Sequence, residues 1–251
     1  MYDFTVQKEM MIAANYLLKK HGLSDVSALG GGTALAAYYW KHRYSTDIDI
    51  FTHSEVDISL LFRPAKWDGN FKNIMKKLDY KESKVHPIYT EFTIKDNFKM
   101  QFLSTTDKTN NPYQLVRLWD MDILLESVEE IIAKKIYFRA HKGNARDLFD
   151  ISIAIHKDPS ILNKLLIPNS KLEELQNTVE TIIREPKLLD EYLYEIGLMN
   201  PNTQYNKLAF NCINYLKQFL DSYLEAKKLS INLNDSELIE IEKYIYYELS
   251  E

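Results

Sequence analysis

The pattern of hydrophobic and polar positions changes character about halfway along the chain. In the first half, apolar residues recur at helical spacing from Val6 to Leu18 and then in short runs that are typical of strands. The polar stretch 95–97 separates two of these runs and predicts a hairpin turn. The elements expected in this half are helices over 6–18, 33–38 and 71–78, and strands over 26–29, 47–51, 88–94 and 98–104.

From about Asp122 onward, helical periodicity runs nearly to the C-terminus and strand patterns almost disappear. Prolines 159, 168, 186 and 201 fall between the periodic segments, as expected of residues that end helices. The predicted helices cover 124–140, 145–155, 172–184, 187–198, 208–224 and 238–249. The chain is therefore expected to be α+β, with a mixed sheet flanked by helices and a C-terminal helical bundle.

Composition agrees with a folded chain of one large or two ordinary domains. The 251 residues are 45% hydrophobic and 12% aromatic, which is enough to bury a core. We expect domains at 1–155 and 156–251, with the boundary as early as residue 122 as the alternative. A net charge of -5 argues against a surface that coats nucleic acid throughout. No signal peptide or apolar run of ~18 residues is evident, which predicts a cytoplasmic protein outside the membrane.

Glycine is scarce, yet three of the 7 glycines are consecutive at residues 30–32, between an expected strand and an expected helix. A glycine turn lets the backbone approach a phosphate closely, and the start of the next helix offers free N–H groups. Thr33, the expected N-cap, adds a hydroxyl. The alternative is an ordinary tight turn, because neither a P-loop nor a Gly-x-Gly-x-x-Gly spacing is present.

Asp47 and Asp49 alternate with Ile48 and Ile50, so both acidic side chains are expected on one face of a strand. Two carboxylates at this separation ionise together at low cost only beside a cation. Mg²⁺ prefers such oxygen ligands and also binds phosphates. An ordinary polar strand face is the alternative for the pair alone. With the glycine turn nearby, the pair predicts a triphosphate held by backbone at one end and by metal at the other.

A second charged segment lies on two expected helices. Lys135 shares a helix face with Arg139, and Asp147 lies three residues before Asp150. Solvated helices with weak surface ion pairs would give the same pattern, so this segment alone does not separate a site from a surface.

Taken together, these segments resemble a known family. The stretch LGGGTAL at 29–35 and the stretch RYSTDIDIF at 43–51 resemble the first motif of nucleotidyltransferases in the DNA polymerase beta superfamily. More narrowly, they are similar to the AbiEii/AbiGii toxin family. The later stretches AKK at 133–135 and RDLFDI at 146–151 resemble that family's second block. The resemblance covers about residues 25 to 155.

The resemblance implies a nucleotidyltransferase-type sheet and Mg²⁺- or Mn²⁺-dependent transfer of a nucleoside monophosphate from an NTP to tRNA, another RNA or a protein. It further implies the toxin of a toxin–antitoxin or abortive-infection pair, with a cognate antitoxin as a partner. A small-molecule, antibiotic-type nucleotidyltransferase and a nucleotide-binding module without turnover remain open. The implied site residues are Asp47 and Asp49 for metal and catalysis; Gly31, Gly32, Thr33, Arg43 and Ser45 for the nucleotide; Lys135 for phosphate; and Asp147 to orient that lysine or to act as a base.

One position departs from the superfamily pattern. A third carboxylate is common on a later strand, and the corresponding stretch here, 99–103, carries Gln101, whose amide oxygen can coordinate but bears no charge. Glu91, on the preceding strand, is the other candidate for a third ligand. The histidines are expected at the surface or in loops. Basic residues that can form either a groove for RNA or a solvated face are Lys41, His42, Arg43, Arg63, Lys66, Lys134, Arg139, His141, Lys142 and Arg146.

Overall fold

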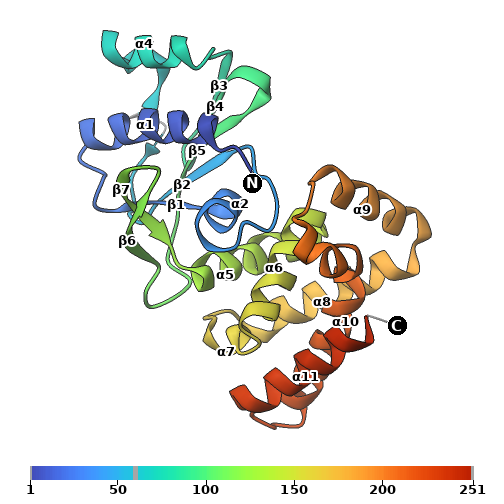
Figure 1. The fold of residues 1–251 in the computed structure, drawn as a ribbon. Coiled ribbons are helices and arrows are strands. Elements are labelled where there is room, and N and C mark those ends of the chain that lie inside the picture. Colours follow the sequence, from blue (N-terminus) through green and yellow to red (C-terminus); the bar gives the residue numbers. More distant parts are fainter. Residues whose placement is uncertain (1, 59–61, 250–251) are drawn as a thin grey trace. The chain divides into compact units, whose positions relative to one another are not determined.

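The computed structural model describes residues 2–58 and 62–249, and the chain divides into two compact units, residues 1–127 and 128–251. In the described residues, the first unit combines a sheet with helices and the second is built from helices (Figure 1). The predicted α+β class and the C-terminal helical bundle are therefore confirmed. The predicted domains, 1–155 and 156–251, stay a prediction.

The sheet of the first unit is mixed. Its strand order, over the part of the chain that the structure describes, is β3-β4-β5-β2-β1-β7-β6. β1 is antiparallel to β2 and parallel to β7, β2 is parallel to β5, and β4 is antiparallel to both β3 and β5. The strands are β1 (Ser27–Gly30), β2 (Ile48–Thr52), β3 (Glu82–His86), β4 (Tyr89–Thr93), β5 (Lys99–Ser104), β6 (Tyr113–Leu118) and β7 (Met121–Glu126).

Alternation along the central strands gives the sheet an apolar face and a polar face. Phe92 and Phe102 are fully buried on the apolar face, with ring centroids 5.9 Å apart. Trp67 packs edge-on against Phe92, with centroids 5.2 Å apart, and also against Phe71 of helix α4 (Gly69–Lys77). Helix α1 (Thr5–Lys20) lies beside α4, where Tyr16 stacks on Phe71. The side chains of Asp49, Gln101 and Glu91 alternate with this apolar set and so lie on the other face.

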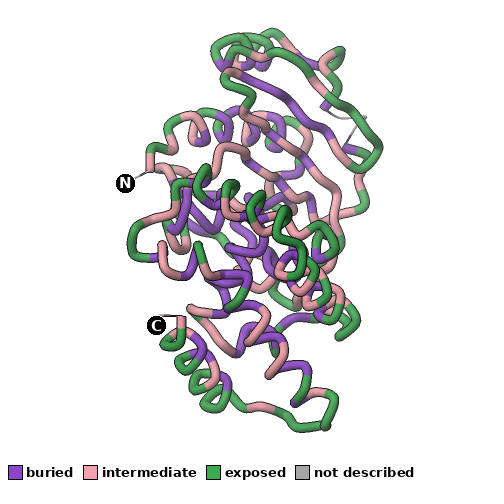
Figure 2. Tube along the Cα trace, turned by 90° about the vertical axis from the view of Figure 1, so that its right-hand side faces the viewer, coloured by how far each residue is buried: buried purple, intermediate pink, exposed green. Residues whose placement is uncertain are grey.

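The second unit is a bundle of helices around an aliphatic and aromatic core. Phe149, Leu175, Leu216 and Phe219 are fully buried, and Cys212 lies among them as a free thiol. Figure 2 shows buried and exposed positions alternating along these helices, as amphipathic packing requires. The helices are α5 (Val128–Arg139), α6 (Ala145–Lys157), α7 (Ile161–Lys164), α8 (Asn169–Arg184), α9 (Pro186–Leu198), α10 (Asn206–Lys228) and α11 (Asp235–Glu248).

Most predicted elements are confirmed, but the start of one helix was wrong, and the strands β3 and β6 were among the elements missed. The predicted helix over 124–140 begins only at Val128, because residues 124–126 belong to β7. The run from Ile123 to Leu125 is continuously apolar, and such a run does not distinguish a strand from a helix. β3 was missed because it is mostly exposed and polar, and β6 was not expected either. No helix among the described residues combines the length and the apolar character needed to cross a bilayer.

Candidate active site

The glycine turn at the end of β1 packs directly against the acidic strand β2. In the antiparallel register, Gly30 is opposite Asp49. Gly31 has a positive φ of +62°, and a Cβ built on it would lie only 2.2 Å from Oδ2 of Asp49. Only glycine therefore fits here, because any side chain would displace the carboxylate and would also strain the backbone. The turn and the Asp49 carboxylate form one small cluster, as the sequence predicted.

This contact gives a prediction with a matched control. Gly31→Ala is expected to cost roughly 1–2 kcal/mol of backbone strain and to push Asp49 out of place. Gly22 has a similar φ of +67° but nothing within 4 Å of its would-be Cβ, so Gly22→Ala carries the strain alone. We expect both variants to lose stability in thermal unfolding, Gly31→Ala at least as much as Gly22→Ala, but only Gly31→Ala to lose nucleotidyl transfer. Equal transfer by the two variants would contradict the role of this contact.

Thr33, Arg43 and Ser45 surround the next glycine. A Cβ on Gly32 would lie 2.2 Å from Nη2 of Arg43 and 3.4 Å from Oγ of Ser45. The hydroxyl of Thr33 donates to the main-chain carbonyl of Asp47 and lies 2.8 Å from the hydroxyl of Ser45. The N-cap prediction for Thr33 was wrong: the short helix α2 (Gly31–Ala34) begins at the second glycine, with Gly30 as its N-cap, and continues as a π-helical turn (Leu35–Tyr39). Thr33 instead ties the turn to the acidic strand.

Asp47 lies immediately before β2 and is held by the neighbouring strand. Its Oδ1 accepts the backbone N–H of Lys99 at 3.0 Å and the hydroxyl of Thr46 at 3.2 Å. The segment that leads into it is anchored by Gln7 of α1, whose amide donates to the carbonyl of Ser45 at 2.6 Å. Gln7 is fully buried, and sequence reasoning missed this anchor because nothing local marks a helical glutamine as a partner of a distant loop.

The two candidates for a third ligand lie in one row with Asp49. Gln101 on β5 is in register with Asp49 on β2 and with Glu91 on β4. The side-chain amide of Gln101 donates to Oε2 of Glu91 at 2.8 Å, and the hydroxyl of Tyr89 donates to the same oxygen. Burial raises the pKa of Glu91, but hydrogen bonds from Tyr89 and Lys84 and nearby lysine charge outweigh it, so the pKa lies below its usual range. Glu91 is therefore an ionised carboxylate with several donors around it.

Tyr89 reports the electrostatic character of this cluster. Its pKa is raised first by burial, then by the hydrogen bond to Glu91 and by the negative charges of Glu91, Asp49 and Asp47. The negative charges of Glu91, Asp49 and Asp47 therefore all act on the hydroxyl of Tyr89. A divalent cation would relieve such a concentration of negative charge, and the oxygen donors of Asp47, Asp49 and Gln101 are those that Mg²⁺ or Mn²⁺ prefers. The residues present thus fit the metal that the sequence predicted.

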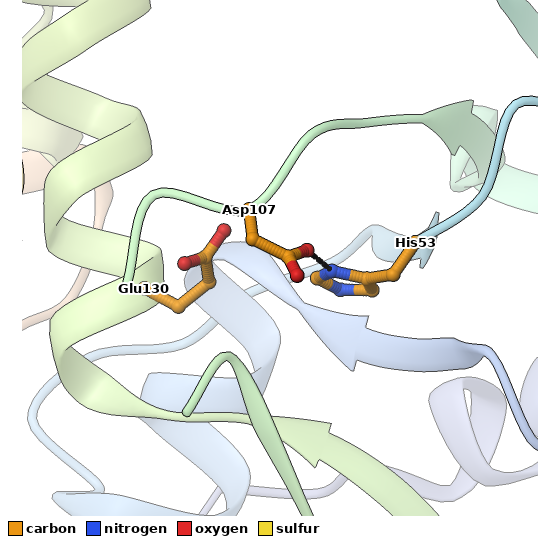
Figure 3. A group of neighbouring side chains, drawn as sticks. All are labelled: His53, Asp107 and Glu130. Atoms are coloured by element: carbon orange, nitrogen blue, oxygen red, sulfur yellow. Dashed lines mark hydrogen bonds and ion pairs between the residues drawn. The ribbon is translucent and has the colours of Figure 1, made fainter. Parts of the chain in front are cut away.

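A buried histidine lies behind the glycine turn. Nδ1 of His53 faces Oδ1 of Asp107 at 2.5 Å, the contact drawn as a dashed line in Figure 3. Its Nε2 is 3.2 Å from Oε1 of Glu126. Oε2 of Glu126 would be 2.1 Å from a Cβ on Gly30, so this carboxylate packs against the first glycine of the turn. His53 and His42 lie in loops, as expected, but neither is at the surface: the side chain of His53 is only 1% exposed, and His42 is fully buried.

Lys135 and Asp147 belong to the second unit, where helices α5 and α6 bring them together. Nζ of Lys135 pairs with Oδ1 of Asp147 and lies 3.0 Å from Oδ2 of Asp150. Burial raises the pKa of Asp147, but the charges of Lys135 and Arg139 outweigh it and bring the pKa below its usual range. Asp150, whose side chain is fully buried, is the second carboxylate of this network, and the helical spacing alone did not show that it shares the lysine.

Several residues of the suggested basic groove are not surface residues. Arg43 and His42 are buried in the first unit. Lys134 is buried in the second unit, where its Nζ lies 3.1 Å from Oε1 of Glu130, one helical turn away. The prediction of a groove lined by these three side chains is therefore wrong.

The thiol of Cys212 is buried as expected, and burial raises its pKa to about 12.

Comparison with known families shows which family the chain belongs to. The family model described as "Nucleotidyl transferase AbiEii toxin, Type IV TA system" matches residues 16–181, which is more than half of the chain. The matched segment holds the glycine turn, the Asp47–Asp49 pair and the Lys135–Asp147 pair. The protein thus falls in the class of nucleotidyltransferases. It belongs to the AbiEii family of nucleotidyl transferase toxins of type IV toxin–antitoxin systems.

Solved structures show weaker similarities. JHP933 from Helicobacter pylori is 20% identical with a TM-score of 0.49, and the match covers 88% of this chain and 93% of that one. A presumed nucleotidyltransferase from H. pylori is 18% identical with a TM-score of 0.46 (100% and 98% covered). An antigenic nucleotidyltransferase-like protein from Paracoccidioides brasiliensis is 14% identical with a TM-score of 0.34 (74% and 92%). No curated protein matches the chain. Family membership rests on the family model, because all three TM-scores are below 0.5.

Proposed function

We propose that this nucleotidyltransferase is metal-dependent and moves a nucleoside monophosphate from an NTP to an RNA acceptor, with tRNA as the first candidate. Asp47 and Asp49 would hold Mg²⁺ or Mn²⁺ and make up the catalytic pair. Gly31 and Gly32 would bring the backbone against the triphosphate, with side-chain donors from Arg43 and Ser45, while Thr33 would hold the turn in place through its bond to the carbonyl of Asp47. A protein acceptor remains the alternative within the same chemistry.

One observation carries the proposal: the glycine turn touches the Asp49 carboxylate. The position where a Cβ of Gly31 would stand is 2.2 Å from Oδ2 of Asp49. A phosphate lying on the backbone of this turn would also lie beside the acidic pair. This is the arrangement that a cation-bound triphosphate needs, because the backbone donors and the metal ligands must reach the same phosphate groups.

The residues of the first unit would have different roles in the transfer reaction. The acceptor oxygen forms a bond to the α-phosphorus, the bond from that phosphorus to the β-phosphate oxygen breaks, pyrophosphate leaves, and the acceptor proton passes to solvent. When bound, the metal supplies charge neutralisation at the phosphates. Arg43, held by its own hydrogen bond to the carbonyl of Tyr44 at 3.0 Å, would add positive charge beside Gly32. Thr33 keeps the turn attached to the strand that carries the carboxylates.

For the second unit, we propose that Lys135 pairs with phosphate oxygens and that Asp147 orients it. The role of Asp147 as a general base is less favoured, because a carboxylate that is paired with a lysine and has a lowered pKa is a weak proton acceptor. As a family toxin, the chain would act in the cytoplasm and be neutralised by a cognate antitoxin.

The experiment uses the full chain, bulk RNA and each of the four NTPs, labelled at the α-phosphate in one set and at the γ-phosphate in the other. We expect metal-dependent incorporation of the α-label into RNA, no incorporation of the γ-label, loss of the reaction with a chelator, and recovery with excess Mg²⁺. Sequencing of the RNA should then show untemplated 3′ nucleotides. Pyrophosphate release without labelled RNA would point to another acceptor, and γ-label in the product would contradict nucleotidyl transfer.

A further inference from the structure

Three neighbouring strands carry one polar side chain each at the same level of the sheet. Asp49 on β2 is in register with Gln101 on β5, and Gln101 is in register with Glu91 on β4. Neighbouring strands are roughly 4.8 Å apart, so the backbone of Glu91 lies about 10 Å across the sheet from the backbone of Asp49, with Gln101 between them. The amide-bearing residue Gln101 therefore lies between the two acidic residues.

The orientation of this amide follows from its partner. Gln101 lies 2.8 Å from Oε2 of Glu91. Glu91 is also within 3.5 Å of Nζ of both Lys84 and Lys99, and it accepts the hydroxyl of Tyr89, so it is an ionised carboxylate that only accepts hydrogen bonds. The atom of Gln101 that faces it must be the donor, Nε2. The carbonyl oxygen, Oε1, occupies the other branch of the planar amide and is turned away from Glu91.

We propose that Glu91 is a positioning residue, which fixes the Gln101 amide so that Oε1 is presented as a neutral third ligand to the cation held by Asp47 and Asp49. This inference rests on the proposed function, since it concerns the same metal. It assigns different roles to the two candidates for a third ligand. Gln101 would contact the ion. Glu91, whose Oε2 accepts the Tyr89 hydroxyl and the Gln101 amide and whose carboxylate lies within 3.5 Å of two lysine Nζ atoms, would act only through Gln101.

A ligand set with two carboxylates and one amide has a specific consequence. It holds a divalent cation with one negative charge fewer than a three-carboxylate set, so the cation is bound less tightly before the triphosphate arrives. Residues that orient metal ligands typically change metal affinity by roughly 10–100-fold when they are removed. Loss of Glu91 should therefore weaken cation binding even though Glu91 itself does not touch the ion.

The test measures Mn²⁺ binding to the full chain without nucleotide, by electron paramagnetic resonance of the free ion. Glu91→Ala should bind Mn²⁺ roughly 10-fold more weakly than the wild type, because Gln101 loses its acceptor. Glu82, an exposed residue on the neighbouring strand β3, provides the matched control, and Glu82→Ala should bind as the wild type does. The exchange variant, Glu91→Gln with Gln101→Glu, keeps the hydrogen bond with donor and acceptor reversed. It should bind Mn²⁺ several-fold more tightly than the wild type, because the oxygen facing the ion is now charged.

The outcomes separate this inference from the proposed function. If the wild type binds Mn²⁺ no better than Asp49→Asn, the metal-dependent function itself is contradicted. If the wild type binds Mn²⁺ but Glu91→Ala and the exchange variant bind it equally well, only the positioning role is overturned. Should Glu91→Ala fail to fold, the exchange variant decides, because it conserves the volume of both positions and the hydrogen bond between them.

Discussion

Asp49→Asn should lose nucleotidyl transfer by roughly 10³-fold or more while the protein stays folded. Asparagine has almost the same volume, so the packing against Gly31 is preserved, but it brings no charge to hold a cation. Asp49 also contributes to the negative charge that raises the pKa of Tyr89, so removing it relieves repulsion among Asp47, Asp49 and Glu91. We therefore expect the melting temperature of Asp49→Asn to equal or exceed that of the wild type. Thermal unfolding and the α-label transfer assay measure the two effects.

An exposed aspartate in the same unit provides the control. Asp25 precedes β1 and is exposed, so Asp25→Asn removes the same charge without touching the glycine turn. Its transfer rate should match the wild type. If purified Asp49→Asn transferred label at the wild-type rate, the assignment of this strand as the catalytic one would be wrong.

Lys135→Met should destabilise the second unit by about 3–5 kcal/mol and abolish productive use of the triphosphate. Methionine fills the volume but leaves Asp147 and Asp150, both buried, as two carboxylates without their shared lysine. Urea unfolding followed by far-ultraviolet circular dichroism suits this measurement, because the described part of the second unit is helical and the three tryptophans, Trp40, Trp67 and Trp119, all lie in the first unit.

A second substitution separates the structural role of Lys135 from its catalytic role. Lys135→Met combined with Asp150→Asn removes one of the two buried carboxylate charges that are left without a lysine. It should recover a large part of the lost stability. It should not recover transfer, because no cation replaces the lysine. A folded double variant with an unchanged KM for the NTP and an unchanged kcat would show that Lys135 serves only the packing of helices α5 and α6.

The glycine turn and the acidic pair could be predicted because their signals are local. Three consecutive glycines and an alternating Asp-x-Asp are rare patterns with direct geometric meaning, and the antiparallel pairing of β1 with β2 brings them together. The strand and helix around the turn followed from the same local patterns.

Other parts of the site depend on contacts that no local pattern records. The sequence marks Gln101 and Glu91 only as candidates, and the hydrogen bond that distinguishes their roles exists because β4 and β5 pair in one particular register. A shift of the register by two residues would have placed Glu91 opposite another partner, with the same pattern of apolar positions. The buried pairing of His53 with Glu126 likewise depends on strands that lie far apart in the chain.

The anchoring of the Tyr44–Thr46 loop by Gln7 has a thermodynamic consequence. Besides its bond to the carbonyl of Ser45, the Gln7 amide lies 3.3 Å from the hydroxyl of Tyr44 and 3.3 Å from the carbonyl of Thr46. A ligand that orders this loop must also favour the docked state of the first turns of α1, since linkage works in both directions. Amide hydrogen exchange in the first turns of that helix is thus expected to slow when the proposed nucleotide site is occupied, although no atom of the helix backbone belongs to that site.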